Sequence, residues 1–487
     1  MSLFQTKSIE SLQTEAANDH SLRRALTATN LVSLGIGAII GAGIFVFTGQ
    51  TAATTAGPAI VLSFVISGIS CLFAALCYAE FASMIPIAGS AYTYSYATLG
   101  EFFAWIIGWD LILEYLFTAP SVAVGWSGLV VSFLKELDIV IPARLTGAPI
   151  DMVEGHYVLT GNFVNLPAVA IIGFLSFLLI LGIKESATFN NVMVVTKVSV
   201  ILLCIAFSIW YVATHFHTAL ANWTPFIPAN TGKWGEFGWS GILTGSAVIF
   251  FAYIGFDAVS TSAQEAKNPQ RDLPRGILGS LIICTVIFIT FSFLLTGLAK
   301  YTTMNNDSPV INALLAAGAP TWLRVLVELA AIMGLSSVCL VMLMGQPRVF
   351  FSMARDGLLP QVFTRTHPRF KTPYVTQSVT GVLAMIIAGA LPLQLLGKLV
   401  NIGTLFAFII VSLAIIVLRR TRPELPRPFR TPWVPVIPIL GSLACLAQML
   451  SLGRDTWIRL LVWFAIGLVI YFSYSRHHSK LGRPGAA

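Results

Sequence analysis

The stretch SLGIGAIIGAGIF at residues 33–45 decides how this chain folds. It places four glycines, Gly35, Gly37, Gly41 and Gly43, inside nine residues of an apolar segment that is long enough to cross a bilayer. Because glycine costs about 1 kcal/mol in a helix interior, this cluster predicts a helix that breaks at membrane depth and frees backbone polar groups for a ligand. The alternative is close helix packing through Gly37 and Gly41, which form a small-residue seam of a kind common in membrane helices. Glycine content alone leaves both interpretations open.

The composition around this stretch excludes a water-soluble enzyme. Charged residues make up 10% of the 487 residues and hydrophobic residues 56%, whereas a soluble domain carries roughly 25% charged residues. The mean hydropathy is +0.81. The chain is therefore expected to be a polytopic membrane protein.

Twelve apolar segments have the length of a spanning helix, so the sequence predicts an all-α integral membrane protein with twelve transmembrane helices in one domain, residues 28–474. A 27-residue N-terminal segment (1–27) precedes this domain and a short tail (475–487) follows it. The segments lie near 28–50, 59–85, 102–134, 166–183, 190–214, 239–261, 275–299, 322–350, 375–392, 397–418, 434–452 and 457–474.

The basic residues predict the orientation. With an even number of spans both termini lie on one side, and that side holds 20 of the 29 Lys and Arg residues, against 8 on the other side and Lys197 inside a span. The positive-inside rule places both termini in the cytoplasm, and we expect the chain to lie in the plasma membrane. Topology also accounts for the net charge of +8, so no nucleic-acid partner is expected.

Three charged residues inside spans are candidate functional groups, because an unpaired charge at membrane depth costs at least about 2.5 kcal/mol. Asp110 and Glu114 lie four residues apart on one face of the third segment, and Lys197 interrupts the fifth. Helical rise puts all three at a similar depth. The acids are either static charge partners within the bundle or functional groups. For Lys197 a functional role is favoured, because burial weakens the hold of an amine on its proton.

Other chemistries lack their residues. None of the seven histidines lies in a span, and the six cysteines lie in apolar runs without a CxxC pair, so no metal site is expected. No Walker-type phosphate loop and no cofactor motif is present, and the chain is not expected to be an enzyme.

Four motifs give the chain a family resemblance. They are GAIIGAGIF, AYTYSYATLGEFFAWIIGWDLILEY (91–115), FFAYIGFDAVSTSAQEAKNPQRDLPRGI (250–277) and QPRVFFSMARDGLLP (346–360). Over residues 22–474 the chain resembles the cationic amino acid transporter branch of the amino acid-polyamine-organocation superfamily. The resemblance implies a leucine-transporter-like fold of two inverted five-helix repeats, at about 28–214 and 239–418, plus two extra helices at 434–474. The broken centres of the first and sixth spans then meet at mid-membrane.

The same resemblance implies an amino acid site made largely of backbone groups. The substrate carboxylate would meet the N–H groups of Gly41, Ala42 and Gly43, where helix-terminal donors favour an anion. The substrate amino group would meet the carbonyl oxygens of Ile39, Phe251 and Ile254. The side chains expected to line the pocket are apolar, namely Ile40, Phe250, Phe251 and Phe256.

Lys197 matches a position at which proton-coupled relatives carry a lysine in place of sodium. The resemblance therefore implies proton-coupled symport of L-amino acids, with Lys197 changing protonation between states. The family suggests cationic substrates such as arginine, while the apolar pocket fits small neutral ones such as alanine. An obligate amino acid exchanger and a non-transporting amino acid sensor remain alternatives. Membrane lipid is an expected partner, and an accessory subunit is not predictable from the sequence.

Overall fold

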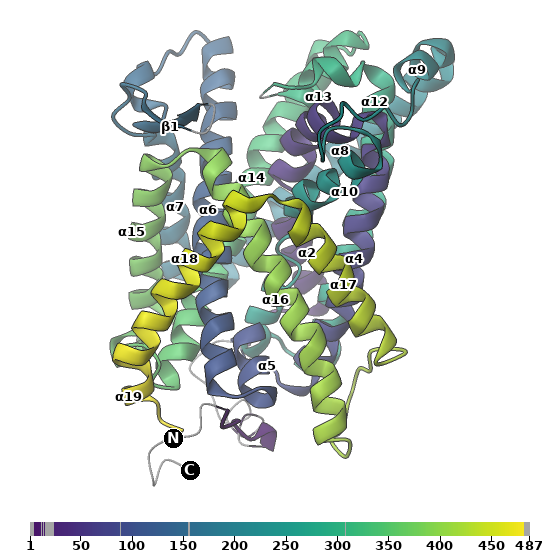
Figure 1. Cartoon of the computed structure of the whole chain (residues 1–487). Coiled ribbons are helices and arrows are strands. Elements are labelled where there is room, and N and C mark those ends of the chain that lie inside the picture. Colours follow the sequence, from purple (N-terminus) through teal and green to yellow (C-terminus); the bar gives the residue numbers. More distant parts are fainter. Residues whose placement is uncertain are drawn as a thin grey trace.

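The computed structural model describes residues 4–10, 12, 14, 24–87, 89–153, 156–306 and 308–481. The predicted N-terminal segment and tail therefore lie partly outside the described residues. Within them the chain is a bundle of helices with one small β-hairpin (Figure 1). Eight helical stretches are long and apolar enough to cross a membrane, and three further apolar helices are shorter. The predicted all-α membrane class is confirmed.

The predicted apolar segments all coincide with helices, and most bounds agree within a few residues. The helices are α2 (Ala28–Ile39), α3 (Thr48–Thr51), α4 (Ile60–Met84), α5 (Ala91–Thr98), α6 (Glu101–Glu136), α7 (Leu166–Leu181), α8 (Ile183–Thr214), α9 (Phe216–Asn222), α10 (Gly238–Ile249), α11 (Ala258–Thr261), α12 (Pro269–Leu298), α13 (Pro309–Ala316), α14 (Thr321–Arg355), α15 (Tyr374–Ala390), α16 (Leu393–Thr421), α17 (Val436–Ser451), α18 (Arg454–Ile470) and α19 (Arg476–His478).

The hairpin is an element that sequence reasoning missed. Strands β1 (Ile150–Val153) and β2 (His156–Leu159) pair antiparallel within the longest stretch between the predicted spans. Both strands contain β-branched and apolar residues, which favour extended backbone over helix. The hairpin lies at the end of the bundle away from the chain termini (Figure 1).

The first apolar segment is broken, as the glycine cluster predicted. Helix α2 begins at a capping box in which Thr27 and Asn30 satisfy each other's backbone N–H groups. It ends at Ile39, and Ile40 is extended, with φ −78° and ψ 101°. The chain then resumes as a π-helical turn, η1 (Gly43–Phe47). The alternative, close packing through these glycines, is also observed, because a Cβ on Gly37 would overlap the side chain of Asn190 and a Cβ on Gly41 would lie 2.6 Å from Val338.

The sixth apolar segment is broken too. Helix α10 tightens into a 3₁₀ turn, η5 (Phe250–Tyr253), and the chain then leaves helical geometry at Ile254, where ψ is 132°. Gly255 follows with φ +118°, a conformation that side-chain-bearing residues rarely adopt. The helical path restarts only at α11. One glycine therefore suffices for this break, because it sits at the residue that must turn.

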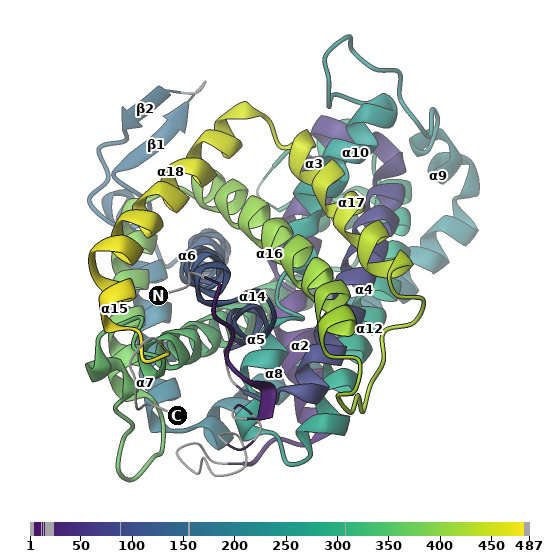
Figure 2. The ribbon, with the colours of Figure 1, turned by 60° about the horizontal axis from the view of Figure 1, so that its bottom comes forward.

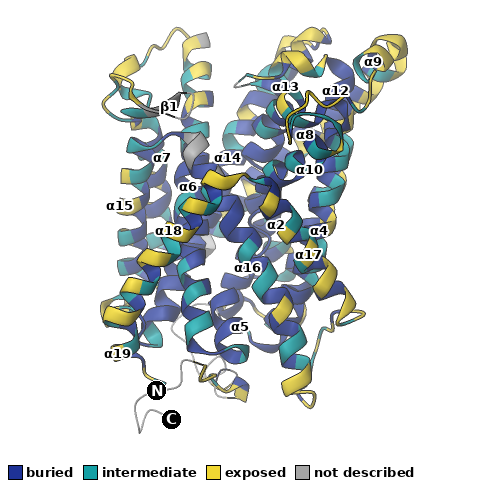
Figure 3. Cartoon of the chain, viewed as in Figure 1, coloured by how far each residue is buried: buried dark blue, intermediate teal, exposed yellow. Residues whose placement is uncertain are grey.

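The two breaks lie directly against each other. A Cβ on Gly43 would overlap the Cα and Cβ atoms of Ala252, and a Cβ on Gly255 would lie 2.6 Å from the Cβ of Ala38. On a third side, a Cβ on Gly41 would lie 2.6 Å from Val338 of α14. Small residues thus bring the two unwound backbones into contact at the buried centre of the bundle (Figure 3).

Candidate substrate and coupling site

Unsatisfied backbone groups converge where the two broken segments meet. The N–H groups of Gly41, Ala42 and Gly43 make no backbone hydrogen bond within the part of the chain that the structure describes. They open the second half of the first span, where a helix has no acceptors of its own for its first amides. Three donors and the positive end of a helix dipole are suited to an anion such as a carboxylate.

The facing backbone offers acceptors. The carbonyls of Ile39, Phe251 and Ile254 are likewise without a backbone donor among the described residues. Each carbonyl precedes or lies within a break, so the i+4 amide that would normally bond it is displaced. Donors on one broken segment and acceptors on both form a backbone frame for a zwitterion.

Aromatic and branched side chains wall this frame. Ile40, Phe250 and Phe256 have no exposed surface, and Phe251 is also buried. The ring of Phe251 stands edge-on to Phe47 with centroids 5.1 Å apart. Phe408 of α16 contacts both Phe250 and Phe256, at 5.6 and 5.0 Å between centroids. The wall is therefore apolar and closed from solvent.

Lys197 lies beside the first break, and its ammonium group donates hydrogen bonds to backbone carbonyls there. Its Nζ atom donates to the carbonyl oxygens of Ile40 at 2.7 Å and Gly37 at 3.0 Å, and to Ser337 Oγ at 2.6 Å. Ser337 also donates to the Gly37 carbonyl at 2.8 Å. The lysine side chain has no exposed surface. A buried cation thus takes up carbonyl groups that the break in α2 leaves open.

The two acids of the third span do not pair with Lys197. Asp110 and Glu114 are fully buried on α6, and within the described residues none of their carboxylate oxygens has a hydrogen-bond partner. Their helix face turns toward α16, where Asp110 Oδ1 lies 2.8 Å from the place a Cβ on Gly403 would take. The sequence groups these acids with Lys197 because all three lie at a similar depth in the membrane. Side chains on different helices can share a depth and still point toward different neighbours.

Asp257 is a buried acid beside the breaks that was not among the candidate residues identified from the sequence. It is fully buried directly after the sixth-span break, and its Oδ2 atom accepts a 2.5 Å hydrogen bond from the hydroxyl of Tyr115. Its other oxygen has no partner among the described residues. Asp257 and Asp110 lie close enough to Glu114 to interact with it electrostatically. The signal available in the sequence was its position three residues after Ile254, inside the predicted site.

Three buried carboxyl groups therefore lie near the apolar side chains described above without a basic side chain bonded to them within the described residues. An ionised carboxylate in such surroundings is costly, so the cluster calls for protons or for a cationic ligand. No group of three His, Cys, Asp or Glu side chains in the described ranges has the arrangement of a metal site.

Comparison with known proteins gives the family. A profile described as amino acid permease matches residues 26–472. The chain is 48% identical to the branched-chain amino acid permease BcaP of Bacillus subtilis, over 99% of each chain. It is 46% identical to the methylthioribose transporter of the same species, over 99% of this chain and 100% of the relative. It is 38% identical to the vacuolar cationic amino acid transporter 4 of Arabidopsis thaliana, over 87% of this chain and 68% of the relative.

The match covers both broken segments, Lys197 and the acids of α6. The helical bundle, the paired breaks and these relatives agree, and the chain belongs to the amino acid permease family as a multi-pass membrane protein.

Proposed function

We propose that this protein imports L-amino acids across the cell membrane by proton-coupled symport with alternating access. The observation that carries the proposal is the position of Lys197, whose ammonium group occupies an all-oxygen site formed by Gly37, Ile40 and Ser337 beside the amino acid frame. Carbonyl and hydroxyl oxygens are ligands that a small monovalent cation would use. A lysine there substitutes a protonatable group for a bound ion.

The proposed architecture has twelve spans, as two inverted repeats near 28–214 and 239–418 followed by two helices within 434–474. Two observations support it. The longest apolar stretch, Ala28–Met84, contains two helical arms, which turn at Gly57 with φ +63°. The first and sixth segments also break at corresponding places and pack together, as inverted repeats require.

In the proposed cycle, substrate and proton bind from outside and leave inside. The zwitterion would lie with its carboxylate at Gly41, Ala42 and Gly43 and its amino group at the free carbonyls. Protonated Lys197 holds the first break closed through the carbonyls of Gly37 and Ile40. When Lys197 loses its proton, its amine can donate one hydrogen bond fewer to these oxygen atoms. The conformation of the first break would therefore depend on the protonation state of Lys197.

For the substrate side chain, we propose a small or branched neutral residue such as alanine or leucine. The wall of Ile40, Phe250, Phe251 and Phe256 offers apolar surface and no hydrogen-bond acceptor on its side chains. A cationic amino acid is the second candidate. The unpartnered carboxyl groups of Glu114 and Asp110 favour it, since they could accept a guanidinium or ammonium group if it reached them.

Uptake into sodium-free liposomes tests the proposal. Purified protein is reconstituted without internal substrate, an inward proton gradient is imposed, and labelled L-leucine, L-alanine and L-arginine are offered separately. We expect leucine or alanine to accumulate and a protonophore to abolish the accumulation. Uptake that requires internal amino acid would mean an exchanger, and binding without either kind of uptake would mean a sensor. A preference for arginine would select the second substrate candidate.

A further inference from the structure

A basic surface cavity lies at the end of the molecule that holds the described chain ends, away from the proposed transport site. It consists of two adjoining depressions of about 590 and 770 Å³, which share Gln270, Arg271 and Pro428. Its walls are the start of α12, the end of α4 and the loop that follows α16 (Figure 2).

All the charged side chains that line this cavity are positive. Four basic residues line it, Arg24, Lys267, Arg271 and Arg275, and no Asp or Glu is among its lining residues. Arg271 and Arg275 are exposed, and in the described ranges neither guanidinium group has an ionic or hydrogen-bonded partner. This arrangement favours an anionic ligand.

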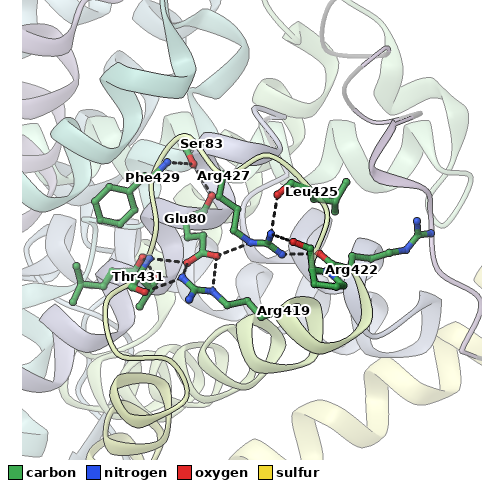
Figure 4. Close-up of polar contacts among 10 residues, drawn as sticks. Glu80, Ser83, Arg419, Arg422, Leu425, Arg427, Phe429 and Thr431 are labelled. Carbon is green, nitrogen blue, oxygen red and sulfur yellow. Dashed lines mark hydrogen bonds and ion pairs between the residues drawn. The ribbon is translucent and has the colours of Figure 1, made fainter.

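The loop wall is held in place by a separate set of arginines (Figure 4). Buried Glu80 accepts from Arg419 at 2.7 and 3.0 Å, lies 3.2 Å from Arg427, and accepts the backbone N–H of Thr431 at 2.7 Å. The backbone N–H of Phe429, which lines the cavity, donates to Ser83 Oγ at 3.3 Å. A wall that is formed in advance lowers the ordering cost of binding.

An apolar groove lies further along the same helix. It has a volume of about 220 Å³ and lies between α12 and the residues Val65, Ile69 and Leu72 of α4. Its walls carry almost no polar atoms. Cavity and groove lie along one face of α12, since the lining residues recur at intervals of three or four: Arg271, Arg275, Leu278, Ile282, Val286 and Ile289.

The dimensions are those of a lipid. At about 1.5 Å per residue, the groove runs from about 9 to about 21 Å beyond Arg275 along α12, whereas one leaflet of the hydrocarbon core is about 15 Å thick. Basic groups at the interface above an apolar groove in the membrane are complementary to a phosphate headgroup with an acyl chain below it. A soluble phosphate compound would use only the upper half.

We propose that cavity and groove together bind one anionic glycerophospholipid of the leaflet that faces the chain termini. Its phosphate lies at Arg271 and Arg275, and one acyl chain lies in the groove between α4 and α12. The site is at the back of α2, because Gly276 and Ser280 on the inner face of α12 pack against Leu31 and Gly35. The lipid therefore contacts the helix that supports the first half of the broken span.

Native mass spectrometry of the purified full chain tests this. Phosphatidylglycerol and phosphatidylcholine are added at equal concentration, and bound lipid is counted for the wild type and for R271Q/R275Q. We expect preferential binding of phosphatidylglycerol, reduced about tenfold to thirtyfold in the variant. The matched control is R365Q/R369Q, which removes two exposed arginines, also four residues apart, from the loop between α14 and α15 at the same end. It should bind as the wild type does.

A second variant addresses the acyl chain and keeps the basic residues. Ile282→Trp fills the groove at a residue that is 52% exposed, so the helix core is not disturbed, and we expect it to weaken phosphatidylglycerol binding as well. If R271Q/R275Q does not yield folded protein, Ile282→Trp decides. Unchanged lipid preference in the folded variants would overturn the proposal, as would displacement of the lipid by millimolar inorganic phosphate, which would identify a soluble anion site.

Discussion

At the scale of single residues, Lys197 differs from Asp110 and Glu114 because its ammonium group has three hydrogen-bond partners. Two carbonyls and a hydroxyl neutralise none of its charge, so the ammonium group is solvated by dipoles and not by a counterion. Asp110 and Glu114 show the opposite condition, since their carboxylate oxygens make no hydrogen bond in the described structure. Both conditions are costly to maintain in a membrane core, which argues for a functional role over a structural one.

Replacing Lys197 with Gln should uncouple transport from protons. The amide of Gln can still donate to the carbonyls of Gly37 and Ile40, so the fold should survive, but it takes up no proton. Leucine accumulation driven by a pH gradient should fall to simple equilibration, while exchange against internal leucine persists. Lys300→Gln, at an exposed position outside the spans, is the control. Accumulation above equilibrium in the Lys197 variant would refute the coupling role.

Glu114→Gln separates the two substrate candidates. The substitution keeps the shape of the side chain and removes its charge. If a cationic side chain binds at Glu114, arginine uptake should fall about tenfold to a hundredfold, because a hydrogen bond to a charged group contributes about 1.5–3 kcal/mol. We expect leucine uptake to be retained in either case. Equal loss for both amino acids would instead place Glu114 in the common transport machinery.

At the scale of elements, the two breaks depend on glycines in different ways. Gly255 has the positive φ that permits the turn, whereas Gly43 permits close approach to the backbone of Ala252. The first break was one of two interpretations that the cluster of four glycines left open in the sequence. The break in the sixth span contains one glycine and was expected only from the family resemblance. A single glycine with a positive φ produces no recognisable pattern in the sequence. The pairing of Asp257 with Tyr115 was not predictable, because it joins residues 142 positions apart.

Gly255→Ala should abolish transport while it lowers the stability of the fold only modestly. The native backbone has φ +118° at this residue, and an alanine in such a left-handed conformation costs roughly 1–2 kcal/mol. The new Cβ would also press on Ala38 at the other break. Uptake of leucine and the melting temperature are measured together. Gly128→Ala in α6, where an added Cβ meets no atom within 4 Å, is the control and should leave both quantities unchanged or raise the melting temperature. Normal uptake by the Gly255 variant would contradict a site built on the unwound backbone.

Glu80→Gln should destabilise the loop between α16 and α17. The change leaves Arg419 and Arg427 without their carboxylate, and breaking a buried ion pair costs about 3–5 kcal/mol. Arg419 is 26% exposed, so solvent screening reduces its share. We expect a clearly lower melting temperature in detergent. The control is Glu424→Gln on the same loop, because the Glu424 carboxylate is 62% exposed and lies 3.8 Å from Arg422. This variant should have no measurable effect on the melting temperature. An equal effect of the two variants would show that Glu80 stabilises the protein no more than a surface acid does.

At the scale of the whole molecule, the end that carries the chain termini is closed by contacts between distant segments. Asp356 after α14 accepts from Lys7 and from the hydroxyl of Tyr92 in α5, both at 2.8 Å. Burial, and then the nearby Asp356 carboxylate, raises the pKa of Tyr92 well above its usual value, so the phenol remains a donor at neutral pH. Arg348 of α14 meets Glu265 after α11 through two bonds of 2.7 and 2.8 Å. These contacts therefore hold segments that are far apart in the sequence together at this end.

The same contacts bear on orientation. The described residues of both termini lie together, since Gln5 donates to the carbonyl of Leu481. Most basic residues belong to this end by the sequence count, which predicts that it faces the cytoplasm. Labelling of single cysteines in intact cells tests this. All six native cysteines are buried, so an impermeant maleimide should give little background on the wild type.

Two positions distinguish the sides. Lys233→Cys lies in the loop between α9 and α10, where the lysine is 78% exposed, and should label in intact cells. Arg369→Cys, exposed between α14 and α15, should label only after the membrane is permeabilised. The reverse pattern would invert the predicted topology. Labelling of both in intact cells would mean that the two loops share a side, which the helical bundle with an odd number of spans between them does not allow.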